Sequence, residues 1–121
     1  MKIKLLVLQD TSGVPLPFTD SFESSEYDVY RATGADVDKL TTIVNHLQPD
    51  LILCEDHFFK SMFHIEEKLP KNIPFIFFTV TGQVAPQVQV NDRPIAYLTS
   101  PFEFNVLNAV VKLMVGPEIL R

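Results

Sequence analysis

Two acidic side chains end the most clearly bounded apolar stretch, and they are the first residues that point to chemistry. The stretch runs over Pro49–Asp56 and holds a Pro-Asp break, four apolar residues, and then Glu55 and Asp56. This pattern predicts a buried strand that delivers carboxylates to its carboxyl end. In an open parallel sheet, ligands and chemistry collect at that end of the strands. We therefore expect a site, or what remains of one, at Glu55 and Asp56.

Glu55 and Asp56, together with Asp10 and His57, are residues of the kinds that bind metal ions. Asp10, Glu55, Asp56 and His57 together could hold a divalent ion, because carboxylates suit Mg²⁺ and histidine suits transition metals. Acidic clusters at strand ends also occur without any metal. The residue types alone leave both interpretations open.

Size and composition indicate the class of protein. The chain has 121 residues, 46% of them apolar, which suits one folded domain with a real core. Its formal net charge is −5 and it has no basic cluster, so we expect no direct binding to nucleic acid or to a membrane. The single cysteine, Cys54, lies among apolar residues and is expected in the core. Because it can form no internal disulfide, the cytoplasm is the simplest compartment.

Apolar runs and their spacing predict strands that alternate with helices. Five strands are expected, at Ile3–Leu8, Tyr27–Ala32, Leu51–Cys54, Ile73–Val80 and Ile95–Leu98. The fourth run is the most apolar, which suits a central strand buried on both faces. Its phenylalanines are expected to be core residues, since no lysine or arginine accompanies them. The alternation predicts a doubly wound α/β sandwich of three layers, with right-handed crossovers that place helices on both faces of a parallel sheet.

Three helices follow from helical spacing and from their start and stop residues. The first starts after an N-cap at Asp36 and stops at Gln48-Pro49, and the second covers Phe58–Leu69. The last covers Glu103–Val115, where Gly116-Pro117 terminates it. A short helix also fits at Thr19–Ser25. The positions predicted to face inward are Val37, Leu40, Val44 and Leu47, then Phe58, Met62, Ile65 and Leu69, and finally Val106, Leu107, Val110, Val111 and Met114.

Residues 81–94 depart from this alternation. A helix is due there, yet Pro86 and Pro94 flank Val88-Gln89-Val90, which alternates with the period of a strand. We expect a loop or a short extended segment in place of a fourth helix. His46 and His64 lie at helix positions beside polar neighbours and are expected on the surface.

Four motifs, in this order and at this spacing, resemble those of the receiver domains of bacterial two-component response regulators, the CheY-like receivers. Pro49–Glu55 resembles the third-strand motif that ends in the phosphoacceptor aspartate, and Ile73–Thr79 resembles the fourth strand with its switch hydroxyl. Tyr97–Phe102 resembles the fifth strand and its Lys-Pro-Phe signature, and Ala32–Gly34 the turn after the second strand. The resemblance implies a flavodoxin-like fold with strand order 2-1-3-4-5 and, here, a degenerate fourth helix. Residues 1–116 would form the receiver-like domain and 117–121 the start of a linker or tail.

The chemistry that the resemblance implies is phosphoryl transfer to an aspartate. It uses two acids that hold Mg²⁺, an acceptor carboxylate, a hydroxyl and a lysine. The two acids correspond to Gln9 and Asp10, the acceptor to Glu55, the hydroxyl to Thr79 and the lysine to Ser100. Three of the five groups are therefore changed, namely those at Gln9, Glu55 and Ser100. Asp10 and Glu55 remain as the carboxylates for a Mg²⁺ ion. Ser100 and the following Pro101 complete this degenerate pocket, although the two residues also fit a plain helix start.

Glu55 has two interpretations. It is either a fixed negative charge that mimics the phosphorylated state or a solvated acid at a strand end with no switch role. As an acceptor, a glutamate places its carboxylate about 1 Å away from the aspartate position, which can cost about 100-fold in a geometry-limited reaction. Asp56 could replace it, but alternation along the strand turns that side chain to the other face.

We therefore expect a receiver domain that is catalytically silent and not an enzyme, and that acts as a protein-interaction or dimerisation module in bacterial signalling. One alternative is a divergent receiver that is still phosphorylated on Glu55 or Asp56 and regulates an attached output domain, such as a DNA-binding domain. A second alternative is a flavodoxin-like binder of a small ligand.

The expected contact face consists of Val84–Asp92, the fifth strand and the last helix, because receivers use the corresponding face for signalling and dimerisation. An extended Val88–Val90 would offer an unpaired edge to a partner strand. A plain surface loop is the other interpretation of this segment.

Overall fold

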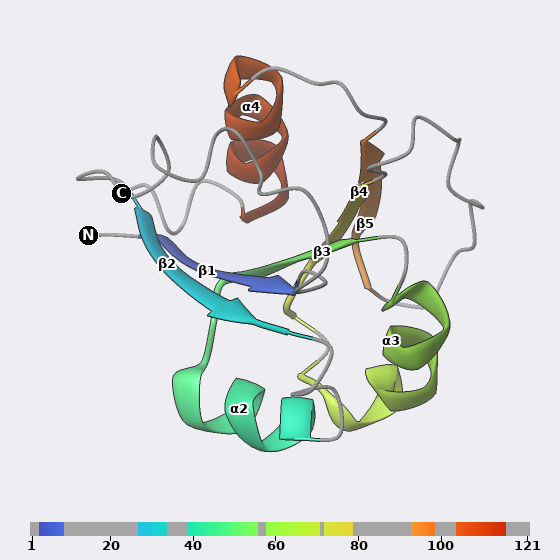
Figure 1. Ribbon diagram of the computed structural model, residues 1–121. Coiled ribbons are helices and arrows are strands. Elements are labelled where there is room, and N and C mark those ends of the chain that lie inside the picture. Colours follow the sequence, from blue (N-terminus) through green and yellow to red (C-terminus); the bar gives the residue numbers. More distant parts are fainter. Residues whose placement is uncertain are drawn as a thin grey trace.

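Five parallel strands form the centre of the molecule in the order β2-β1-β3-β4-β5 (Figure 1). The computed structural model describes residues 3–8, 27–33, 39–55, 58–70, 72–78, 93–98 and 104–115, apart from the side chains of 59, 60 and 104. The strands are β1 Ile3–Leu8, β2 Tyr27–Ala32, β3 Leu51–Glu55, β4 Phe75–Phe78 and β5 Ile95–Leu98. The predicted strand order and the parallel, flavodoxin-like sheet are confirmed.

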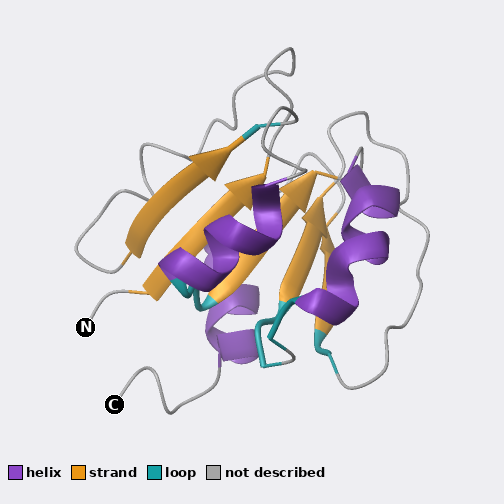
Figure 2. Cartoon of the chain, turned by 90° about the horizontal axis from the view of Figure 1, so that it is seen from below, coloured by secondary structure: helices purple, strands orange, loops and turns teal. Residues whose placement is uncertain are grey.

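Helices lie on both faces of this sheet. They are α2 Leu40–Leu47, α3 Phe59–Ile65 with the 3₁₀ turn η3 Glu66–Lys68, and α4 Phe104–Val115. Figure 1 shows α4 on one face and both α2 and α3 on the other, and Figure 2 shows the sheet behind α2 and α3. The three-layer arrangement is therefore as predicted.

Each face of the sheet has its own apolar core, because side chains alternate along every strand. Leu5, Val7, Leu53 and Ile76 pack with α4, whereas Leu6, Leu8, Ile52, Phe75 and Phe77 pack with α2 and α3. Every residue of β4 is buried, which confirms a central strand covered on both faces. On the α4 side, the Tyr27 hydroxyl donates to Oδ1 of Asn108 and links β2 to the helix.

Asp50 fixes the start of β3 against β1. Its backbone N–H donates to the Lys4 carbonyl at 2.8 Å, and its carboxylate accepts the Lys4 N–H at 2.8 Å. The next residues continue this pairing, with Leu51 opposite Leu5 and Cys54 opposite Leu8. The Pro-Asp break therefore sets the register that carries Glu55 to the sheet's carboxyl edge.

Two strand boundaries differ from the prediction. β3 is one residue longer and includes Glu55, which pairs with Phe78. β4 begins at Phe75 and not at Ile73, because Pro74 has no N–H to donate to a ladder. The Pro74 carbonyl still accepts the Ile52 N–H at 3.1 Å.

Helix α2 begins later than predicted. Lys39 occupies its N-cap position, so the assignment of Asp36 as N-cap is wrong, and Asp36 itself lies outside the described residues. The predicted stop is confirmed, since Gln48 takes a left-handed conformation with φ 53° and donates its N–H to the Val44 carbonyl at 2.8 Å. Leu40 and Val44 are buried, as their spacing predicted.

The other helices keep most of their predicted inward stripes. The α-helical part of α3 ends at Ile65 and the 3₁₀ turn η3 follows, and Phe58, Met62 and Leu69 are buried. In α4, Leu107 and Val111 are buried, but the inward assignment of Val106 is wrong because 47% of that residue is exposed.

Several predicted features lie outside the described residues. They are the short helix at Thr19–Ser25, the strand end at Thr79 and Val80, the segment 81–92 in place of a fourth helix, the start of the last helix at Glu103, and the stop at Gly116-Pro117.

Candidate functional site

Glu55 is the one residue of the predicted pocket that the structure describes. It ends β3 with only 7% of its surface exposed. Alternation places it on the same side of the sheet as Leu51 and Leu53, whose side chains pack in the α4 core. The interpretation of Glu55 as a solvated acid is therefore wrong. A buried carboxylate remains at the position where the resemblance places a phosphoacceptor.

The strands that should carry the rest of the pocket end at one edge. Leu8 lies opposite Cys54, Glu55 opposite Phe78, and Phe78 opposite Leu98, so β1, β3, β4 and β5 finish side by side (Figure 1). The remaining predicted residues lie outside the described ranges, namely Gln9, Asp10, Asp56, Thr79, Ser100 and Pro101. The structure thus confirms that these strands end at one edge of the sheet. The contacts among the side chains of the predicted pocket stay predictions.

Most of the predicted metal ligands also lie outside the described residues. In residues 3–8, 27–33, 39–55, 58–70, 72–78, 93–98 and 104–115, no three His, Cys, Asp or Glu side chains gather closely enough to hold an ion. Asp10, Asp56 and His57 lie outside those ranges. A Mg²⁺ site at Asp10 and Glu55 therefore stays a prediction.

Other predicted residue environments are confirmed. Cys54 is fully buried, without a disulfide, and its thiol lies 3.4 Å from the Glu55 carbonyl oxygen, to which it donates. His46 and His64 are exposed on α2 and α3. The phenylalanines of β4 are buried, and the rings of Phe77 and Tyr97 stack at 5.8 Å.

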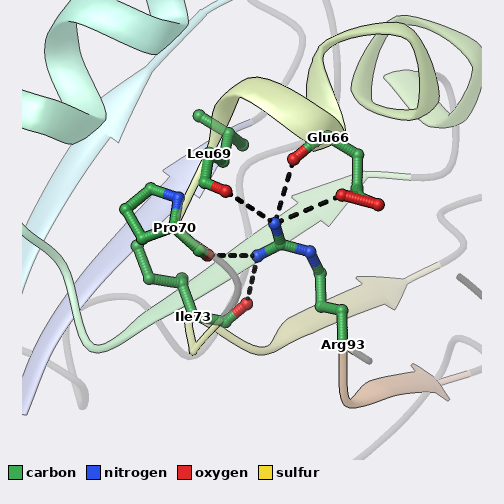
Figure 3. A network of polar contacts seen from close by, with 5 residues as sticks. All are labelled: Glu66, Leu69, Pro70, Ile73 and Arg93. Atoms are coloured by element: carbon green, nitrogen blue, oxygen red, sulfur yellow. Dashed lines mark hydrogen bonds and ion pairs between the residues drawn. The ribbon is translucent and has the colours of Figure 1, made fainter. Parts of the chain in front are cut away.

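A buried arginine at the opposite edge of the sheet was not predicted from the sequence. Arg93, which precedes β5, is only 5% exposed. Figure 3 shows its polar contacts with Glu66, Leu69, Pro70 and Ile73. Its Nη1 donates to the carbonyls of Pro70 at 2.8 Å and Ile73 at 2.6 Å. Its Nη2 donates to the carbonyls of Glu66 at 3.0 Å and Leu69 at 3.1 Å. The guanidinium therefore joins the end of η3 to the starts of β4 and β5.

The guanidinium of Arg93 pairs with one carboxylate and makes a cation–π contact with one aromatic ring. Glu66 Oε2 lies 3.4 Å from Nη2, and the ring centre of Phe75 lies 4.4 Å from the guanidinium carbon. Burial lowers the pKa of Arg93, while the charge of Glu66 and its hydrogen bond oppose that shift. The residue holds the amino ends of β4 and β5, far from the edge where Glu55 lies. We assign it a structural role.

The comparisons with known proteins agree with this geometry. No protein-family model matches the sequence, and no curated protein is similar enough to it to count as a relative. Among solved structures, the chain is similar to the N-terminal domain of the nisin resistance regulator NsrR, a lantibiotic response regulator. The identity is 18% and the TM-score 0.66, with 96% of this chain and all of that domain covered. The fold is that of a response-regulator receiver domain.

The same fold occurs inside a much larger protein. The chain is also similar to part of the lysine decarboxylase LdcF of Francisella novicida, with 10% identity and a TM-score of 0.59. That match covers 93% of this chain and 17% of the decarboxylase. At such identities the two likenesses establish the receiver fold and nothing about activity.

None of the helices in the described ranges is long and apolar enough to cross a membrane.

Proposed function

We propose that this receiver-like domain is a signalling module that accepts no phosphoryl group and acts through protein contacts. The observation that carries the proposal is a buried glutamate, Glu55, at the carboxyl end of β3 in a receiver fold. A glutamate there supplies a permanent negative charge where a receiver would acquire one by phosphorylation. Such a module is a binding protein and not an enzyme.

The sequence removes the groups that would support phosphoryl transfer. Gln9 stands where a second Mg²⁺-binding acid is expected, and Ser100 stands where a lysine would neutralise the phosphoryl oxygens. Asp10 and Glu55 are the carboxylates left to hold a Mg²⁺ ion, and two ligands without a phosphate bind it weakly. The receiver fold and the disulfide-free Cys54 support a cytoplasmic location.

The outer surface of α4 is the contact face that the structure supports best. Val106 and Leu113 are 47% and 81% exposed, and the exposed Ala109 and the partly buried Val110 lie between them. This spacing forms one apolar stripe along the helix. Next to it, edge strand β5 is only partly buried. We propose that α4 and β5, together with 84–92, contact a second copy of the chain or another protein.

Phosphoryl acceptance is the direct test of silence. The protein is incubated with acetyl phosphate and Mg²⁺ beside a receiver known to be phosphorylated, and both are weighed by intact-mass spectrometry. We expect a gain of one phosphoryl group in the known receiver and no gain in this chain. A stable gain in this chain would reject silence. Its loss in Glu55→Gln or in Asp56→Asn would then identify the acceptor.

A further inference from the structure

Helix α2 and edge strand β2 enclose a groove of about 580 Å³ that the receiver-type site does not use. Its floor is apolar. Leu6 and Ala32 are buried, and Ile43 and Leu47 are partly buried against the core on this side of the sheet. Tyr30, which is 40% exposed, adds an aromatic ring to the wall. The volume lies within the range of about 300–1,000 Å³ that is typical of small-ligand sites.

One side of helix α2 forms a wall of the groove. Lys39, Thr42, Ile43 and His46 all line it, and their spacing of three, four and seven residues places them along one side of α2. Lys39 and His46 are therefore separated by about 10.5 Å along the helix axis. Both are exposed, so their polar ends border the apolar strip between them.

The charge of this groove opposes that of the whole molecule. The chain has a formal net charge of −5, yet the groove is lined by Arg31, Lys39 and His46 and by no acidic residue among those described. An apolar floor with a basic rim complements a ligand that has a hydrocarbon body and an anionic head.

We propose that the groove binds a small amphipathic carboxylate whose body is an unbranched chain of about eight to ten carbons, close to the length of two helical turns. The Lys39 ammonium binds the carboxylate, and the chain lies over Ile43 and Leu47. The groove lies on the sheet face opposite α4, so this site is independent of the contact face and of Glu55.

Decanoate is the probe for this site. Titration of the ¹⁵N-labelled chain should give saturable shifts of amides in α2 and β2. Lys39→Glu reverses the charge of the head-group site, and Thr42→Trp fills the groove from an exposed position, so each should weaken binding at least about tenfold. Lys68→Glu, at an exposed position of η3 outside the groove, is the matched control and should bind decanoate like the wild type. Spectra of the free variants establish that each is folded.

Three results would overturn the proposal. One is the lack of saturable shifts at low-millimolar decanoate, and another is undiminished binding by folded Lys39→Glu and Thr42→Trp. The third is equal binding of decyltrimethylammonium, which has the same chain and the opposite charge. If an acidic amphipathic peptide shifts the same amides while decanoate does not, the groove is a protein-docking surface and the small-molecule assignment is wrong.

Discussion

The guanidinium of Arg93 donates to four backbone carbonyls of the surrounding turns. Two of them also accept a backbone N–H, the Glu66 carbonyl from Leu69 and the Pro70 carbonyl from Ile73. Two of them, those of Glu66 and Leu69, belong to the end of η3, and the other two lead into β4. Removing the side chain would leave these acceptors and the Glu66 carboxylate buried without this donor. Such a loss costs far more than the loss of an exposed ion pair.

We therefore predict that Arg93→Met lowers the free energy of unfolding by about 3–5 kcal/mol. Urea titration followed by far-UV circular dichroism measures this change. Arg31→Met, on the exposed part of β2, is the matched control and should cost less than about 1 kcal/mol. Equal effects of the two substitutions would show that the buried network contributes no more to the free energy of unfolding than an exposed arginine does.

The degenerate pocket allows a prediction of gained function. The triple variant Gln9→Asp, Glu55→Asp and Ser100→Lys restores the second acid, the shorter acceptor and the lysine. We expect it to gain one phosphoryl group from acetyl phosphate under conditions in which the wild type gains none, since a shift of about 1 Å in acceptor position alone can change such a rate about 100-fold. Intact mass against time gives the rate. The double variant that keeps Glu55 is the control and should remain unmodified, and a triple variant that gains no mass would mean that the fold itself lacks the pocket.

For single residues, the sequence predicted where Glu55 lies along its strand, but it did not predict that Glu55 and Arg93 are buried. The apolar run before Glu55 correctly predicted that this residue lies at a strand end. Its burial was not predicted, because a glutamate is seldom buried, and one of the two interpretations therefore took Glu55 to be a solvated acid. Arg93 gave no sequence pattern at all, because its partners are mostly backbone carbonyls, which every residue has. A buried arginine of this kind is found only once the turns around it are folded.

The sequence pattern was sufficient to predict which helices and strands form, but it predicted their first and last residues less well. The five strands and three described helices were all predicted, because each has an apolar run or stripe or, in β2, residue types that favour strands. Pro74 shortened β4 through its missing donor, and the turn after Ile65 tightened to 3₁₀, an effect that helical spacing does not encode. Val106 sits beside buried Leu107, and only the packing direction of α4 decides which of the two faces the core.

The end of α2 yields a stability prediction for one element. Gln48 is held at φ 53°, a conformation that costs a residue with a Cβ about 1–2 kcal/mol and costs glycine little. Gln48→Gly should therefore raise the free energy of unfolding by about 1 kcal/mol. Thermal and urea unfolding measure the gain. Gln48→Ala keeps the Cβ and should show none, and an equal gain in both variants would assign the effect to the lost glutamine side chain.

For the whole molecule, the two sheet faces carry different surfaces. The α2 and α3 face holds a groove with a basic rim, whereas the α4 face ends in an apolar stripe. Leu113, at 81% exposure, contributes almost nothing to the core of the single chain. Exposed apolar residues that lie in register along a helix mark interaction sites more often than isolated ones do. The sequence did not predict this stripe, since its helical spacing assigned Val106 to the core.

Self-association through that stripe is the prediction that tests the module as a whole. We expect the wild-type chain to increase in mass with concentration in sedimentation-equilibrium experiments. Leu113→Glu places a charge where burial would be required, and should weaken association at least about tenfold, because an unpaired charge is costly at an interface. Val106→Glu should act in the same direction, with a smaller effect in proportion to its lower exposure.

Phe63→Glu is the matched control, since it also changes an exposed apolar residue, 50% exposed, but lies on α3 across the sheet. It should associate like the wild type while keeping the same circular dichroism spectrum as Leu113→Glu. If Phe63→Glu weakens association as strongly as Leu113→Glu does, the contact is non-specific and the α4 face has no special role. A wild-type chain that is monomeric at every concentration would reject the homodimer and leave a different protein as the occupant of the stripe.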